Sequence, residues 1–190
     1  GVFVDESNEE IRVLCKLYPW EWLAGENFGP NLLASSLRVI EPAWKMLLSN
    51  KGLLPILWEL FPDHPNLLPA HFEPGRIRGD YVEKPLLSRE GANVVIHKDG
   101  QTIAADGEYG EEGRIYQAYA PIPRFGDDYV TIGAWIIGDE PAGIGLREDA
   151  SPITRNTSRF VPHYFTEYTT TRSTPTLSES LAGLPVFLLF

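Results

Sequence analysis

The first residues that could do chemistry lie between Lys84 and Asn93, where a lysine at the end of a predicted strand precedes a loop of small residues. Such a loop can lay backbone N–H groups over phosphate oxygens, while the lysine supplies a point charge. The glycine spacing fits neither a Walker loop nor a dinucleotide fingerprint. A solvated strand end is the simpler interpretation of this stretch taken alone, so both interpretations stay open.

A second candidate is the stretch from Arg114 to Pro121, a predicted strand that runs into a linker stopped by proline. Where two lobes meet, such a linker can offer a carbonyl and an N–H group to an adenine edge. An ordinary core strand leaving its sheet explains the same pattern, and it is the simpler interpretation.

The third candidate is Arg147, which leaves a glycine-flanked strand beside Glu148 and Asp149. Two neighbouring carboxylates can hold a guanidinium rigid and direct it at a substrate carboxylate or phosphate. A structural pair between this arginine and an aspartate at a strand end is the simpler alternative.

Other reactive residue types indicate no site. The four histidines are dispersed without metal-ligand spacing, so no metal-binding residue is predicted. The single cysteine, Cys15, excludes an intramolecular disulfide, and its apolar strand pattern predicts a buried thiol. The acidic stretch that begins at Asp106 predicts a solvated loop.

Composition narrows the classes of partner. The chain has 190 residues with 16 Lys and Arg against 26 Asp and Glu, which gives a net charge of −10. A chain this acidic repels nucleic acid and anionic membranes, so we expect neither as a partner. Any phosphate must be held locally by a few placed cations and N–H groups. Small-molecule substrates are the expected partners, and the oligomeric state stays open.

The sequence predicts a cytoplasmic protein. Four acids and no basic residue lie in Gly1 to Glu10, which is unlike a signal peptide. The longest apolar stretch, Leu181 to Phe190, is too short for a membrane helix. We read the chain as part of a longer protein.

The predicted fold is α+β, with a helical first third followed by a largely antiparallel sheet. Apolar spacing predicts a strand over residues 11–18 and then helices over 31–40, 44–48 and 51–60. Alternation and turn residues predict six later strands, over 81–86, 93–97, 102–104, 114–119, 129–137 and 142–146. Residues 166–190 are rich in Ser and Thr and then apolar, and they predict a disordered tail beyond a single domain over 1–165.

Together these stretches resemble the C-terminal ATP-grasp region of the glutathionylspermidine synthase family. The resemblance covers about residues 10 to 165. It rests on five strings: KLYPWEW from Lys16, IEPAWKMLLSNKGLLPILWELFP from Ile40, YVEKPLLSREGANV from Tyr81, IYQAYAPIPRFGD from Ile115 and GIGLREDASPITRNTSRFVPHY from Gly143.

The resemblance implies a partial ATP-grasp domain of an ATP-dependent carbon–nitrogen ligase, with ATP and Mg²⁺ as cofactors. Such an enzyme joins a glutathione-like peptide carboxylate to a spermidine-like polyamine through an acyl phosphate. The nucleotide-binding residues that it implies are Lys51, Lys84, Ser88, Arg89, Glu90, Gly91, Ala92, Gln117, Ala118 and Tyr119, with Arg147 as the catalytic residue.

The sequence departs from the family pattern in two ways that bear on the expected ligase activity. The family's magnesium carboxylates and much of its peptide site precede these motifs, so we expect the isolated chain to be inactive. The tail after about Phe165 matches nothing in the family. The alternatives are a non-catalytic ATP- or peptide-binding module and a ligase of the same family with a different peptide and amine.

Overall fold

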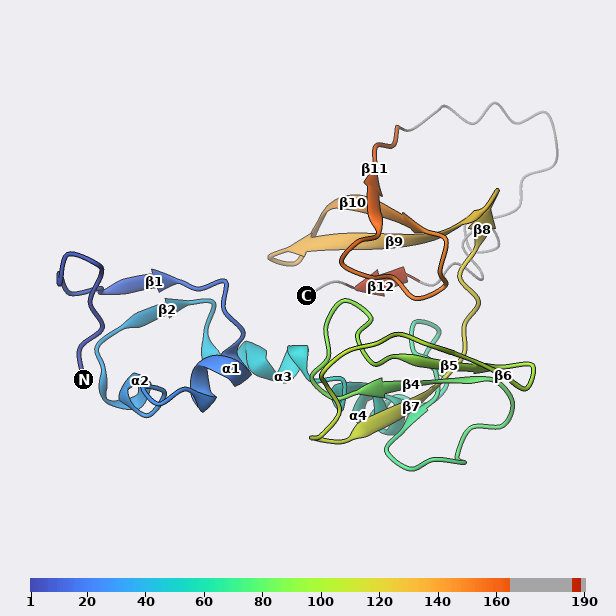
Figure 1. The fold of residues 1–190 in the computed structure, drawn as a ribbon, viewed down its shortest axis with the longest axis horizontal. Coiled ribbons are helices and arrows are strands. Elements are labelled where there is room, and N and C mark those ends of the chain that lie inside the picture. Colours follow the sequence, from blue (N-terminus) through green and yellow to red (C-terminus); the bar gives the residue numbers. More distant parts are fainter. Residues whose placement is uncertain (165–185, 189–190) are drawn as a thin grey trace. The chain divides into compact units, whose positions relative to one another are not determined.

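The computed structural model describes residues 1–164 and 186–188. The chain divides into two compact units, residues 1–50 and residues 51–190 (Figure 1). The predicted ligase domain over 1–165 spans both units, and its boundaries stay a prediction. None of the helices among the described residues is long and apolar enough to cross a membrane.

The first unit is built around two short parallel strands, β1 (Val13–Cys15) and β2 (Arg38–Ile40). Its helices are short: α1 (Trp20–Gly25), α2 (Asn31–Ala34), a 3-10 helix (Ala43–Lys45) and α3 (Met46–Ser49). The thiol of Cys15 is exposed, which corrects the buried thiol expected from its strand pattern. Only the middle residue of β1 turns inward.

The helical first third is not confirmed, because residues 1–60 hold short helices, including α3 and α4 near the predicted positions, together with the two strands β1 and β2. Proline stands immediately before α1, α2 and the 3-10 helix, as Pro19, Pro30 and Pro42, and it keeps each helix separate from the residues before it. The helix predicted over 31–40 ends at Ala34, and residues 38–40 form β2 instead. The β-branched Val39 and Ile40 pair with β1, and this long-range pairing overrides the helical spacing of the apolar residues.

The second unit begins with helix α4 (Leu53–Leu60) and a five-stranded antiparallel sheet in the order β3-β7-β4-β5-β6. Its strands are β3 (Ala70–His71), β4 (Tyr81–Pro85), β5 (Val95–Lys98), β6 (Gln101–Ala104) and β7 (Arg114–Ala118). Val82 pairs with Ile96 and Lys84 pairs with Ile115, so these four side chains share one face. Ile96 and Ile115 are buried on that face, and they anchor the strand that carries Lys84.

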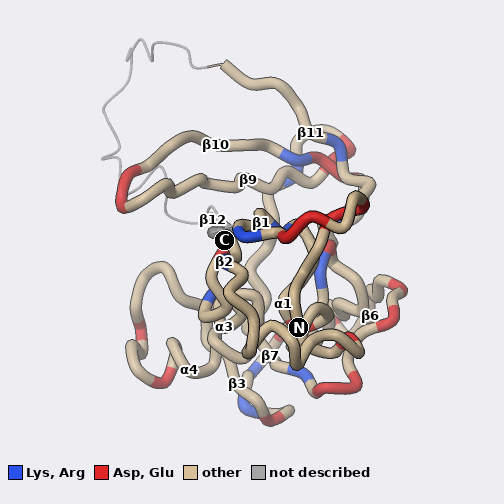
Figure 2. The backbone as a smooth tube through the Cα atoms, turned by 90° about the vertical axis from the view of Figure 1, so that its left-hand side faces the viewer, with Lys and Arg blue, Asp and Glu red and all other residues tan. Residues whose placement is uncertain are grey.

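A second sheet follows in the order β11-β10-β9-β12, with β8 beside β9. Its strands are β8 (Arg124–Phe125), β9 (Asp128–Ile137), β10 (Glu140–Asp149), β11 (Arg159–Val161) and β12 (Val186–Leu188). The long β9–β10 hairpin leaves Trp135, Ile136 and Ile137 exposed near its turn. Acidic residues lie at this turn, and basic residues lie where β10 approaches β11 (Figure 2).

The α+β class and the antiparallel character of the later sheets are confirmed. All six strands predicted between residues 81 and 146 are present, with bounds that shift by a few residues. Of the tail predicted as disordered over 166–190, only residues 186–188 are described, and they form β12, parallel to β9. The rest of that tail lies outside the described residues.

Candidate functional site

Two lysines converge at the end of β4. The backbone N–H of Lys51 donates to the carbonyl of Leu86 at 2.8 Å, and its ammonium donates to the carbonyl of Ser88. The ammonium of Lys84 donates to Oε1 of Gln117 on β7 at 2.7 Å. The structure therefore brings together four of the residues predicted to bind a nucleotide.

The two ammonium groups affect each other. Burial of Lys84 and, to a smaller extent, repulsion by Lys51 together lower the pKa of Lys84 to about 8. A lysine whose charged form is disfavoured in this way gains stability when an anion lies beside it. The pair is thus suited to a negatively charged group such as a phosphate.

The loop after β4, residues 88–92, has an unusual backbone. Glu90 and Gly91 have φ values of 53° and 72°, in the left-handed region. Ser88 is 4% exposed, and its hydroxyl has no hydrogen-bond partner among the described residues. A buried hydroxyl without a partner is costly, so a ligand atom that bonded to it would be stabilised.

The predicted adenine linker is engaged within the protein. The N–H groups of Ala118 and Tyr119 donate to the carbonyls of Pro69 and Asp80 at 2.8 and 3.1 Å. These two N–H groups are therefore occupied within the protein, and the adenine-binding role of Gln117, Ala118 and Tyr119 stays a prediction. An adenine contact from them would use a carbonyl oxygen or a side chain.

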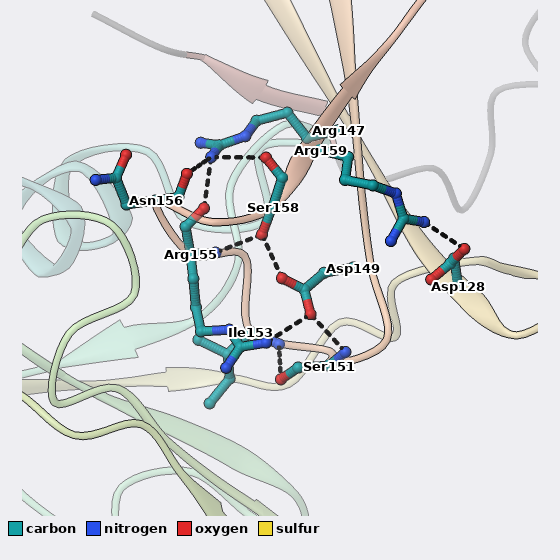
Figure 3. A network of polar contacts seen from close by, with 9 residues as sticks. All are labelled: Asp128, Arg147, Asp149, Ser151, Ile153, Arg155, Asn156, Ser158 and Arg159. Carbon is teal, nitrogen blue, oxygen red and sulfur yellow. Dashed lines mark hydrogen bonds and ion pairs between the residues drawn. The ribbon is translucent and has the colours of Figure 1, made fainter.

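Arg147 lies on β10 opposite Thr131 of β9 and Phe160 of β11. Its Nη2 donates to the carbonyls of Arg155, Asn156 and Ser158 (Figure 3). Its guanidinium carbon lies over the Phe160 ring, 4.9 Å from the ring centroid. Its Nε is buried and has no hydrogen-bond partner within residues 1–164 and 186–188.

The carboxylates expected to hold Arg147 act elsewhere. Glu148 lies 3.5 Å from Arg159, and Asp149 bonds to residues of the loop 151–158. Adjacent residues of a strand point to opposite faces, so Glu148 cannot lie beside the guanidinium of Arg147. Loop carbonyls therefore hold this arginine instead of its sequence neighbours.

A cavity of about 420 Å³ lies between the loop 88–92, the start of the acidic loop and the loop 151–157. Arg89, Glu90 and Ala92, all predicted to bind phosphate, line one side of it, and Arg155 and Asn156 line another. Lys51, Lys84 and residues 117–119 do not line it. The predicted residues are thus not all in one place. Lys51, Lys84, Ser88 and Gln117 lie together at the end of β4, whereas Arg89, Glu90 and Ala92 line the cavity.

Sequence reasoning missed the loop 151–158. Its signal was the run of Ser, Thr and Asn after Asp149, residues that bond to nearby backbone groups and shape loops. The acidic loop is exposed at Asp106, Glu108, Glu111 and Glu112, as predicted. Among the described residues, no group of three or more His, Cys, Asp or Glu could hold a metal ion, so we assign no metal ligand.

Comparison with known proteins decides the family. Residues 1–166 match the family model described as glutathionylspermidine synthase preATP-grasp. The chain belongs to the glutathionylspermidine synthase family. The matched description names the preATP-grasp part, so assignment of these residues to the C-terminal ATP-grasp region is not what the match shows.

Named relatives agree with a ligase family. The chain is 47% identical over 173 residues to a provisionally named acid–amine ligase of Haemophilus influenzae, with 86% of this chain and 44% of that protein covered. It is 40% identical over 186 residues to the trypanothione synthetase of Crithidia fasciculata, covering 84% of this chain and 28% of the relative. It is 32% identical over 135 residues to the bifunctional glutathionylspermidine synthetase/amidase of Escherichia coli, covering 69% of this chain and 22% of the relative. The chain thus spans less than half of the length of each of these three relatives.

Proposed function

We propose that this chain supplies the ATP-binding part of an ATP-dependent carbon–nitrogen ligase of the ATP-grasp type. The observation that carries the proposal is the Lys51–Lys84 pair at the loop 88–92. Lys51 and Lys84 repel each other, and a bound anion would relieve that repulsion. The hydroxyl of the buried Ser88 has no hydrogen-bond partner among the described residues, and the anion would also accept a hydrogen bond from it. Family membership favours a nucleoside triphosphate, ATP, over other anions.

In the proposed reaction, a carboxylate oxygen of a peptide attacks the γ-phosphorus of ATP, and ADP leaves. An amine nitrogen then attacks the acyl carbon, phosphate leaves, and the amine loses a proton. Negative charge develops on the transferred phosphoryl group, so fixed cations beside it lower the barrier. Lys51 and Lys84 would neutralise the phosphates of ATP, and the loop from Ser88 to Ala92 would cover them.

The other predicted residues take secondary roles. Gln117 acts through its hydrogen bond to Lys84. Ala118 and Tyr119 would bound the adenine with carbonyl oxygens. Arg147 would stabilise the transferred phosphoryl group or the acyl phosphate through the edges of its guanidinium that do not bond to the loop.

The class of substrate that we propose is taken from the names of the relatives. The names of two of them refer to glutathionylspermidine and trypanothione, so we propose a glutathione-like peptide and a polyamine of the spermidine type. A same-family ligase with a different peptide and amine is the alternative that the relative named as an acid–amine ligase favours. We place the reaction in the cytoplasm, where ATP is supplied. Mg²⁺ would be held by residues outside the part of the chain that the structure describes.

The proposal is tested by thermal unfolding of the 190-residue chain with and without nucleotide. At 100 times its dissociation constant, ATP should add about 2.7 kcal/mol to the free energy of unfolding. Adenosine should stabilise less, because it lacks the phosphates that the lysines hold. No stabilisation by ATP would contradict the proposal.

A second assay separates a ligase from a binding module. With glutathione and spermidine, we expect this chain alone to release no phosphate, because its described residues include no group of three or more His, Cys, Asp or Glu that could hold a metal ion. ADP formation that depends on the amine would show that the chain is a complete enzyme.

A further inference from the structure

The loop 151–158 is held in place by one carboxylate. Asp149 is 8% exposed and accepts hydrogen bonds from the N–H of Ser151 at 2.8 Å, from Nη2 of Arg155 at 2.9 Å and from the hydroxyl of Ser158 at 2.6 Å (Figure 3). The Ser158 hydroxyl also accepts from the N–H of Arg155 at 2.7 Å. The start, middle and end of the loop therefore converge on the same side chain.

This loop in turn fixes Arg147. The three carbonyls that accept hydrogen bonds from Nη2 of this arginine all belong to the loop, at Arg155, Asn156 and Ser158. Their positions depend on the loop backbone, which Asp149 organises. A shift of the loop would therefore move the guanidinium.

The same loop touches the loop 88–92. A Cβ added to Gly91 would lie 2.5 Å from the carbonyl oxygen of Thr154 and 2.7 Å from Cγ2 of Ile153. Such close approach is possible only for glycine. The hydroxyl of Thr154 lies 2.8 Å from that of Thr131 on β9, so the loop 151–158 presents a fixed surface to Gly91.

We infer that Asp149 is a positioning residue that sets both the orientation of Arg147 and the conformation of the loop 88–92. The inference rests on the proposed function for its catalytic meaning. The coupling between the two loops can be measured without any nucleotide. Asp149 itself touches neither the peptide nor the amine and acts through the loop 151–158.

The carboxylate is required because three donors face it. An asparagine has nearly the same shape, but it offers one acceptor oxygen and places an NH₂ group where the other donors point. In the Asp149→Asn variant at least one of the bonds to Ser151, Arg155 and Ser158 is therefore lost. The loop 151–158 is released without removal of any atom of the phosphate-binding loop.

Glu148 provides a matched control. It neighbours Asp149 and carries the same charge, but it lies 3.5 Å from Arg159 of β11 and makes no described contact with the loop. Glu148→Gln removes the same charge from the same strand. The difference between the two variants isolates the contacts of Asp149.

The test is hydrogen exchange of backbone amides, followed by mass spectrometry of the free 190-residue chain. In Asp149→Asn we expect exchange to quicken by about tenfold or more in 151–158 and also in 88–94, while Glu148→Gln exchanges like the wild type. Faster exchange confined to 151–158 would overturn the inference, because a purely local structural role predicts that pattern. Unchanged exchange in both segments, or equal changes in both variants, would also overturn it.

Two further measurements keep the outcome decisive. If Asp149→Asn fails to fold, Ser158→Ala removes the bond to Asp149 together with the bond that this hydroxyl accepts from the N–H of Arg155, and it should also give faster exchange in 151–158 and in 88–94; no increase in 88–94 would then refute the coupling. In a parallel arm, ATP should stabilise the wild type more than Asp149→Asn. Absence of ATP stabilisation in the wild type would refute the proposed function, whereas the exchange data alone decide the coupling of the loops.

Discussion

The ammonium of Lys84 donates a 2.7 Å hydrogen bond to the side-chain oxygen of Gln117 on the neighbouring strand β7. Gln117 is 7% exposed, so its carbonyl oxygen depends on this donor. From the sequence, Lys84 was expected to contribute little to packing as a strand-end residue. The structure corrects that expectation, because loss of the lysine leaves a buried amide without its partner.

Lys84→Met should therefore weaken ATP binding by about tenfold or more and also lower the free energy of unfolding by about 1–3 kcal/mol. Isothermal titration and urea denaturation measure the two effects separately. The double variant Lys84→Met/Gln117→Met should recover much of the stability but none of the binding, because both polar partners are gone. Wild-type ATP affinity in the single variant would exclude a phosphate contact.

ATP affinity should fall as the pH rises through about 8. The pKa of Lys84 is lowered to about 8 by burial and by Lys51, so above that pH its ammonium loses its proton and its attraction for phosphate. Lys84→Arg stays charged over the whole range, and its affinity should change little between pH 7 and 9.5. Equal pH profiles for the two proteins would contradict this assignment.

The same group affects stability in the opposite direction. Because the folded-state pKa lies below the ordinary value of 10.5, the unfolded chain binds more protons between about 8 and 10.5. The contribution of Lys84 to the free energy of unfolding should therefore rise with pH across this window. Urea midpoints of the wild type and Lys84→Arg, compared at several pH values, measure it.

Gly91→Ala should destabilise the chain more than Gly100→Ala. Both glycines have positive φ, at 72° and 74°, so both substitutions carry a backbone cost of about 1–2 kcal/mol. Nothing lies within 4 Å of a Cβ on Gly100, whereas a Cβ on Gly91 would collide with Thr154. Equal decreases in the melting temperature of the two variants would contradict this prediction, because they would mean that the loop 151–158 moves away from the new Cβ without a loss of stability.

Acid should weaken the fold through Asp149. Burial raises the pKa of this carboxyl, but hydrogen bonds from Ser158, Arg155 and Ser151 outweigh burial and lower it to about 2. Its stabilising contribution is therefore complete above about 4 and is lost as the pH falls from about 4 toward 2. Asp149→Asn should lack this step in urea midpoints measured at pH 5, 4 and 3, and a variant that retains it would refute the assignment.

Strands with local signals could be predicted from the sequence. The β5–β6 hairpin turns at Asp99 and Gly100, whose positive φ values suit the tight turn that an Asp-Gly pair favours. The helix over 31–40 was wrong because residues 38–40 are held by pairing with β1, more than twenty residues earlier in the chain. Such pairing leaves no local pattern.

The candidate site, like the fold, could be predicted only where a short stretch of sequence carries the signal. Lys84 and the loop from Ser88 were found because a strand end and small residues are visible in one short stretch. The partners of Arg147 were not, because they are backbone carbonyls of a loop whose position depends on Asp149 and on the approach of Gly91 to Thr154. Carbonyl acceptors have no residue type, so the sequence cannot display them.

The exposed end of the β9–β10 hairpin has a consequence for handling the protein. Trp135, Ile136 and Ile137 are consecutive, exposed and strongly β-forming, and they extend past the residues of β9 that pair with β12. An apolar strand end of this kind is a template for edge-to-edge aggregation. Solubility at high concentration should therefore be limited by this hairpin, and Ile137→Lys would place a charge at its exposed end that opposes such association.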